Sequence, residues 1–251
     1  MPEREGRLGV PIGVDGVEIK LSFDSTQIAD ATRVFKLEPD KGKSRRIWFG
    51  ENRRGAGGPS ALPLSARGII LRIREKKKSD ATLKLRGPDG CIDPAAWRER
   101  TAGFGKVARL EGDWAGRRRL ISASVDSELS DAARDELTAP APSLPLLLSD
   151  EQRRLARELM IPLTDLELLG PIDATKWDPE DDDGFAAELW DVDGDLRFLE
   201  ISILVSDDPL GAQRRLEQAA IDGGLRLDPE QDTKTSTVLR HLASRRSPDP
   251  N

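Results

Sequence analysis

One stretch of the chain, residues 67–86, constrains the fold more than any other. It reads RGIILRIREKKKSDATLKLR, and apolar side chains alternate with basic or polar ones along most of it. Alternation with a period of two predicts β-strands, and the polar pair Ser79-Asp80 predicts a turn between them. The stretch is therefore expected to be a β-hairpin with one apolar face and one strongly basic face. The basic face carries Arg72, Arg74, Lys76, Thr82, Lys84 and Arg86.

Other segments extend this pattern along the chain. Strands are expected at residues 17–23, 45–49, 107–114, 120–129, 185–192 and 196–205, and helices at 25–34, 149–160, 210–221 and 233–243. Asp193-Gly194 predicts a tight hairpin turn, and Ser149 followed by Gln152 predicts a capping box. We expect an α+β fold: a mostly antiparallel barrel or tunnel of at least seven strands with flanking helices. A closed barrel can place charged strand faces around a lumen, whereas an open sheet would expose them to water.

The side chains that the chain offers exclude several classes of enzyme. Its 251 residues include one histidine, His241, one cysteine, Cys91, and no tyrosine. A lone histidine in a polar tail supports neither a Ser-His-Asp triad nor a multi-histidine metal site. A single thiol forms neither an intramolecular disulfide nor a zinc cage, and we expect it to be inert. Carboxylates, guanidinium groups and ammonium groups remain as the available chemistry.

Hydropathy and charge narrow the choice of partners. No apolar run approaches the roughly 20 residues that span a bilayer, and no signal-peptide pattern opens the chain, so we expect a cytoplasmic protein without a membrane partner. The net charge of −6 conceals a basic half: residues 1–120 carry a net +10 and residues 121–251 a net −16. A basic half can indicate nucleic-acid binding. Because strand alternation turns many of these basic residues to one face, we do not expect nucleic acid as a partner.

Two other segments carry no expected chemistry. The glycine-rich residues 55–60 lack the G-K-[ST] ending of a phosphate-binding P-loop. The acidic residues 180–183 lack the ligand spacing of a calcium loop and are expected to be solvated.

Charged motifs follow one another along the chain in a specific order. They are Glu18 and Lys20, Arg72 and Arg74, Thr82 and Lys84, Glu111 and Asp113, Glu200, and Lys234. This order resembles the E-x-E-x-K, R-x-R, T-x-K and late E-x-E motifs of the CYTH domain, the triphosphate tunnel metalloenzyme superfamily. That superfamily includes class IV adenylate cyclases, thiamine triphosphatases and inorganic triphosphatases. Within it, the chain is similar to a bacterial subset in which SDEQ, LLGPI, ELW and DTKT recur.

The resemblance implies a domain organisation and a site. It implies one tunnel domain over residues 15–243, a flexible N-terminal segment at 1–14 and a flexible tail at 244–251. The implied phosphate-binding residues are Lys20, Arg72, Arg74, Lys84 and Lys234, and the implied ligands of Mg²⁺ or Mn²⁺ are Glu18, Glu111, Asp113 and Glu200. Asp191 is a further metal candidate, because we expect it to lie across the predicted hairpin on the face of Glu200. Arginine forks suit phosphate oxygens, and Mg²⁺ prefers carboxylate oxygens.

The implied function is metal-dependent hydrolysis of inorganic triphosphate, thiamine triphosphate or a nucleoside triphosphate. If the ribose 3′-hydroxyl of bound ATP attacks its own α-phosphate instead, the product is cyclic AMP, as in class IV adenylate cyclases. A third possibility is a degenerate tunnel that binds a polyphosphate or nucleotide without turnover. It is motivated by Gly16 and Ser202, which stand where the family has glutamates, and by residues 49–51, which read FGE where FDT is usual.

Overall fold

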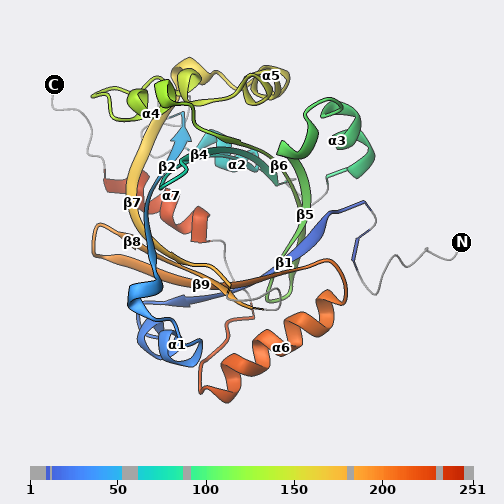
Figure 1. Ribbon diagram of the computed structural model, residues 1–251, viewed down its shortest axis with the longest axis vertical. Helices are drawn as coiled ribbons and strands as arrows, with labels where there is room; N and C mark the ends of the chain where they lie inside the picture. The colour runs from blue at the N-terminus through green and yellow to red at the C-terminus, as the bar shows by residue number, and fades with distance from the viewer. Residues whose placement is uncertain are drawn as a thin grey trace, which may run out of the picture.

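Nine strands close into a barrel (Figure 1). They are β1 (Gly16–Asp24), β2 (Lys43–Glu51), β3 (Ile69–Glu75), β4 (Asp80–Arg86), β5 (Ala108–Ala115), β6 (Arg118–Glu128), β7 (Glu167–Trp177), β8 (Ala186–Val192) and β9 (Leu196–Val205). In the computed structural model their order is β1-β5-β6-β4-β3-β2-β7-β8-β9, and β9 pairs with β1. Only the β1–β5 pair is parallel among the nine. The expected α+β fold with a mostly antiparallel tunnel is confirmed.

The structure describes residues 10–11, 13–52, 62–86, 92–179, 184–229 and 234–245. Cys91, the glycine-rich residues 55–60 and the acidic residues 180–183 lie outside the described residues. So does most of the two terminal segments that we expected to be flexible.

Seven α-helices occur in the described ranges. They are α1 (Ile28–Val34), α2 (Pro63–Ala66), α3 (Pro94–Arg100), α4 (Asp131–Leu137), α5 (Asp150–Glu158), α6 (Pro209–Asp222) and α7 (Lys234–Arg245). Short 3₁₀ turns form at η2 (Pro39–Lys41), η3 (Gly105–Val107), η4 (Leu144–Leu147) and η5 (Leu163–Asp165). The predicted capping box at the start of α5 is confirmed by reciprocal hydrogen bonds between Ser149 and Gln152. None of the helices described is long and apolar enough to cross a membrane.

The apolar strand faces point outward and pack under the helices. Val17, Ile19 and Leu21 of β1 join residues of β9, α1 and α6 in one buried cluster. The outer faces of β3, β4 and β6 form a second cluster with α2, α3, α4 and α5. Burying the apolar residues outside the barrel leaves the charged residues of the same strands facing the lumen, since side chains alternate between the two faces.

Helix α7 packs against one part of the barrel from inside its outline (Figure 1). Its Val238, Leu239 and Leu242 form a third buried cluster with residues of β2, β7 and β8, including Trp190. Trp190 also lines the lumen, as does Lys234, the first residue of α7. Strands β2, β7 and β8 therefore carry an apolar patch that packs against α7, beside the lumenal Arg45, Lys176 and Glu188.

Some elements of the fold differ from the expectations, and one predicted turn is confirmed. The helix predicted from residue 25 begins at Ile28, because the Asp24 carboxylate accepts hydrogen bonds from the backbone and hydroxyl of Thr26 and holds a turn there. Strand β7 was not predicted, because Gly170-Pro171 interrupts its alternation opposite a bulge in β2. The Asp193-Gly194 turn is confirmed, and both of its residues have positive φ.

Candidate functional site

The barrel lumen contains a cavity of about 330 Å³, and its described lining is strongly charged. Ten lining residues are basic: Lys20, Arg45, Arg72, Arg74, Lys84, Arg86, Arg109, Arg118, Lys176 and Lys234. Six are acidic: Glu18, Glu111, Asp113, Asp126, Glu188 and Glu200. A lumen with four more cations than carboxylates attracts anions, and its low-dielectric walls strengthen that attraction.

Strands β1, β4 and β5 bring together what we call the Asp113 cluster: Asp113 with Lys20, Lys84 and Arg86. Asp113 Oδ1 lies 3.0 Å from Lys20 Nζ, and Oδ2 lies 2.8 Å from Arg86 and 3.6 Å from Lys84. Burial raises the pKa of Asp113, but the three cations outweigh it and hold that pKa well below the usual range. Burial lowers the pKa of Lys84 to about 8 although Asp113 opposes the shift. The cluster therefore holds three cations around one buried anion.

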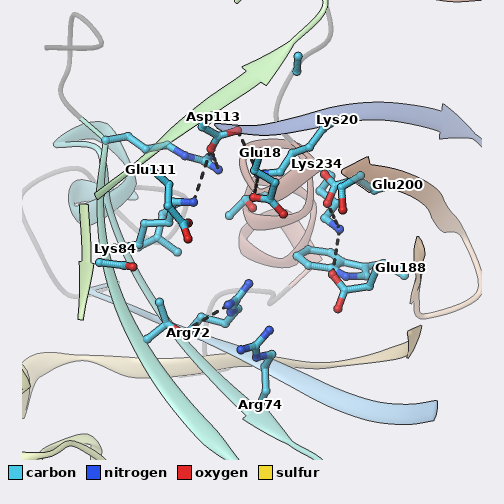
Figure 2. A pocket seen from close by; sticks show the side chains of 18 of the residues that line it. Glu18, Lys20, Arg72, Arg74, Lys84, Glu111, Asp113, Glu188, Glu200 and Lys234 are labelled. Carbon is cyan, nitrogen blue, oxygen red and sulfur yellow. Dashed lines mark hydrogen bonds and ion pairs between the residues drawn. The ribbon is translucent and has the colours of Figure 1, made fainter. Parts of the chain in front are cut away.

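Glu18 and Glu111 lie beside this cluster on the paired strands β1 and β5 (Figure 2). Glu18 forms an ion pair with Lys20 at 2.7 Å, and Lys20 and Lys84 lower the pKa of Glu18 to about 2 against the opposing effect of burial. Burial raises the pKa of Glu111, and nearby Glu18 adds to that shift. The partner of Glu111 is Arg109, at 3.2 Å. At Glu111, burial and Glu18 therefore outweigh the attraction of the nearby cations.

Across the lumen, Arg45, Arg72 and Arg74 form what we call the arginine wall, on β2 and β3. Arg45 pairs with Glu188 at 3.2 Å, and Arg74 pairs with Asp80 at 2.7 Å. Arg72 differs: within the described residues it has no ion pair, and it donates a 3.4 Å hydrogen bond to the Thr82 hydroxyl. Its buried Nε has no acceptor. Burial and the neighbouring Arg74 lower the pKa of Arg72 to about 10 and outweigh the attraction of Glu188 and other lumenal carboxylates.

A third group, the Lys234 cluster, ties α7 to β8 and β9. Lys234 Nζ lies 3.0 Å from Glu188 and 2.9 Å from Glu200, which face each other across the β8–β9 pair. The same ammonium stands 4.3 Å from the centre of the Trp190 ring. Burial raises the pKa of Glu188, but Lys234 and Arg72 outweigh it, and the net shift is downward. Figure 2 shows the three groups arranged around the lumen.

The structure brings together nine of the ten residues that the sequence singled out. Asp191 is the exception, and the expectation that it shares a face with Glu200 is wrong. The β8–β9 register pairs Glu188 with Glu200 and places Asp191 opposite Arg197. Asp191 lies on the outer side of the barrel, where it bonds Arg197 at 3.1 Å and the Gly194 backbone N–H at 2.9 Å. An offset of three residues along a strand reverses the face, so Asp191 cannot reach the lumen.

Several lumenal residues were not among those that the sequence singled out for the site. They are Arg45, Arg86, Arg109, Arg118, Asp126, Lys176 and Glu188. Arg86 continues the alternation of Thr82 and Lys84, so the pattern itself contained that signal. Glu188 could have been found from the hairpin register, counting back from Asp193-Gly194 to the residue opposite Glu200. Lys176 lies on β7, where the interrupted alternation gave no usable signal.

The expected departures from the family pattern also have structural consequences. Ser202 lines the lumen opposite Lys20, so no carboxylate stands there. At Gly16, an added Cβ would lie 3.1 Å from the Val205 carbonyl oxygen and 3.3 Å from Leu204 Cδ1. Glu51 is buried away from the lumen, where it accepts hydrogen bonds from the backbone N–H groups of Asn52, Leu64 and Ser65. Glu51 thereby caps the N-terminus of α2.

The carboxylates of the lumen fit a divalent ion with few protein ligands. Within the described ranges, no group of three or more acidic, histidine or cysteine side chains is placed to hold a metal ion. Mg²⁺ does not require such a group, since one or two carboxylates, phosphate oxygens and waters usually complete its shell. Glu18 and Glu111 are hard oxygen donors on adjacent strands, and each has one cationic partner in an ion pair. These two residues match that requirement.

Solved structures share this fold. A candidate adenylate cyclase from Bacillus halodurans superposes with a TM-score of 0.60 at 15% identity, covering 89% of this chain and 97% of its own. A candidate adenylyl cyclase from Hippeastrum, described as having a dominant triphosphatase activity, superposes with a TM-score of 0.56 at 18% identity, covering 89% and 94%. No protein-family model matches the sequence, and no curated protein matches it.

Fold and lumen together define a closed β-tunnel protein with a polycationic interior. The superpositions confirm the expected fold: the chain shares the architecture of these two solved structures.

Proposed function

We propose that the protein is a phosphohydrolase that acts on a triphosphate or nucleotide inside the tunnel. The observation that carries the proposal is Arg72, a lumenal guanidinium without an ion pair among the described residues, set in a lining that has an excess of cations. An anion with several phosphoryl groups would supply the missing negative charge. Inorganic triphosphate, thiamine triphosphate and nucleoside triphosphates all carry such a chain. The names of the two solved relatives support this substrate class.

In this proposal the cations bind and orient the phosphate chain. Arg72 and Arg74 offer planar forks that suit pairs of phosphate oxygens, and Lys20, Lys84 and Lys234 add point charges from other walls. Fixing the chain in one orientation brings the reacting phosphoryl group into line with its nucleophile. Fixed positive charge also stabilises negative charge that develops in the transition state.

Glu18 and Glu111 would hold a Mg²⁺ or Mn²⁺ ion. When bound, such an ion neutralises charge on the phosphate oxygens and activates a water molecule. Glu200 lies farther round the barrel and is held by Lys234, so we assign it to the placement of that lysine. Because the same lining would serve attack by water or by a ribose 3′-hydroxyl, the assay must separate hydrolysis from cyclisation.

The test is a substrate screen. Pure protein is incubated with tripolyphosphate, thiamine triphosphate or ATP, each with Mg²⁺ or Mn²⁺, and phosphate, pyrophosphate and cyclic AMP are measured. We expect phosphate or pyrophosphate release from at least one substrate, and a loss of about 100-fold in Lys84→Ala. Lys77→Ala, which removes a lysine at the exposed hairpin tip, should leave the rate unchanged. Cyclic AMP as the main product would reassign the protein as a cyclase, and no product beyond the Lys84→Ala background would reject catalysis.

A second candidate function is binding of a polyphosphate or nucleotide without turnover. Gly16 and Ser202 favour it, because two positions that carry glutamate in the family lack a carboxylate here. Calorimetry with tripolyphosphate, with and without Mg²⁺, distinguishes the two functions. Tight binding that is independent of metal, together with an empty substrate screen, would favour the binding module.

A further inference from the structure

The carboxylates of the tunnel differ in how many of their oxygens already contact cations and in how exposed they are. Asp113 is 1% exposed, and both of its oxygens already contact cations. The side chains of Glu18 and Glu111 are 32% and 16% exposed, and each has a single cationic partner in an ion pair. A ligand of a metal ion must present an oxygen that the ion can approach. Asp113 presents none without breaking contacts to Lys20 and Arg86.

Asp113 also stands where three cations of two strands converge. Lys20 comes from β1, and Lys84 and Arg86 come from β4, whereas Asp113 belongs to β5. Three cations that share a small volume repel one another, and long side chains lose rotamer entropy when they are held in place. One buried carboxylate between them offsets the repulsion and fixes each head group at one position.

We infer that Asp113 is a positioning residue, which fixes Lys20, Lys84 and Arg86 for the phosphate chain, and that it does not bind the metal ion. This inference rests on the proposed function. It separates the four acidic residues that the family pattern implies as ligands into an accessible pair, Glu18 and Glu111, and two residues that hold cations, Asp113 and Glu200.

The inference makes an unusual prediction about charge. Removing a carboxylate from the lumen lowers the repulsion of an anion, so on charge alone any such variant should bind tripolyphosphate more tightly. Asp126→Asn provides this control, because Asp126 lines the lumen but pairs with Arg109 and Thr82. Asp113→Asn makes the same change of charge but releases three cations. It should therefore bind tripolyphosphate more weakly, by about 10- to 100-fold, although its lumen is more positive.

The experiment measures two affinities in each variant. Calorimetry gives the affinity for tripolyphosphate without metal, and electron paramagnetic resonance gives the affinity for Mn²⁺ alone. For Asp113→Asn we expect weaker tripolyphosphate binding and Mn²⁺ affinity within about threefold of wild type. Loss of a metal ligand should lower the Mn²⁺ affinity by at least the roughly 10- to 100-fold that is typical of losing a residue that only supports a ligand. For Glu111→Gln we expect the opposite pattern: Mn²⁺ should bind more weakly, and tripolyphosphate should bind at least as tightly as in wild type. Asp126→Asn should match or exceed wild type for tripolyphosphate.

Two further variants keep the inference testable if Asp113→Asn does not fold. Asp113→Glu keeps the carboxylate and should restore part of the tripolyphosphate affinity. Arg86→Gln leaves Asp113 paired with two lysines, and should weaken tripolyphosphate binding without changing Mn²⁺ binding. Loss of Mn²⁺ binding in Asp113→Asn or Arg86→Gln, or tighter tripolyphosphate binding in Asp113→Asn, would overturn the inference. If wild type binds neither ligand, the proposed function fails as well; if it binds both and only the variants disagree, the inference alone fails.

Discussion

The Asp113 cluster and the arginine wall carry the same sign of charge, yet they differ in how that charge is compensated. In the Asp113 cluster, one buried carboxylate contacts all three cations. In the arginine wall, Arg45 and Arg74 have carboxylate partners and Arg72 has none among the described residues. A count of basic residues would rate the two regions alike. Their counter-ions show that one region is stabilised within the protein, while the other gains from an added anion.

The largest expected effect comes from removing the internal counter-ion. Asp113→Asn removes the carboxylate that Lys84 and Arg86 contact and leaves Lys20 paired only with Glu18, so the free energy of unfolding should fall by about 3–5 kcal/mol. Urea denaturation at pH 7 measures this change. Asp126→Asn, whose partner Arg109 is half-exposed, should lose clearly less. An equal loss in both variants would mean that the Asp113 cluster contributes no more to the free energy of unfolding than the Asp126–Arg109 pair.

The next effect comes from Arg72 and has opposite signs for stability and binding. Arg72→Met keeps an unbranched apolar stem and removes a buried cation without an ion pair, so the ligand-free protein should become more stable by about 1 kcal/mol. Tripolyphosphate affinity should fall by about 30-fold, the size of a lost charge-assisted contact. Thermal unfolding and calorimetry check the two signs. A variant that is less stable would show that Arg72 already has a compensating partner.

A smaller effect should appear as a pH dependence. With a pKa of about 8, Lys84 is protonated below pH 8 and loses its charge above it, so tripolyphosphate affinity should fall by about tenfold between pH 7.5 and 9.5. Lys84→Arg should remove this dependence, because arginine stays protonated. The same depressed pKa means that the unfolded chain binds more protons between pH 8 and 10.5, and Lys84 therefore contributes stability that rises with pH in that window. Calorimetry at four pH values tests the binding, and a fall of equal size in Lys84→Arg would contradict the assignment.

The smallest expected effect is the contribution of an exposed ion pair outside the lumen to the free energy of unfolding. Asp30 and Arg33 form an exposed pair on α1, three residues apart. Arg33→Ala should change the free energy of unfolding by less than about 0.5 kcal/mol, because water and salt screen such a pair. Urea denaturation in parallel with Asp113→Asn gives the comparison. A loss of several kcal/mol at this surface site would remove the distinction between buried and exposed pairs.

The sequence was sufficient where one strand carried both the fold and the site. The alternation in residues 67–86 predicted β3 and β4, and with them the lumenal positions of Arg72, Arg74 and Lys84. It was insufficient where a position depended on a partner far along the chain. The contacts of Asp113 need the parallel pairing of β1 with β5, and the face of Asp191 needs the β8–β9 register. Neither register can be read from one strand alone.

The position of β1 between β5 and β9 has a consequence for how the chain folds. Its partners lie far apart in sequence: Glu18 pairs with Asp113 on one side and with Leu204 on the other. During synthesis from the N-terminus, the first strand must wait for β9 before the ring can close, and such distant pairings are slow to form. Until then, Glu18 and Lys20 remain in water. The lumenal cavity is thus among the last parts of the molecule to form, and a chain that stops before β9 would lack the closed lumen.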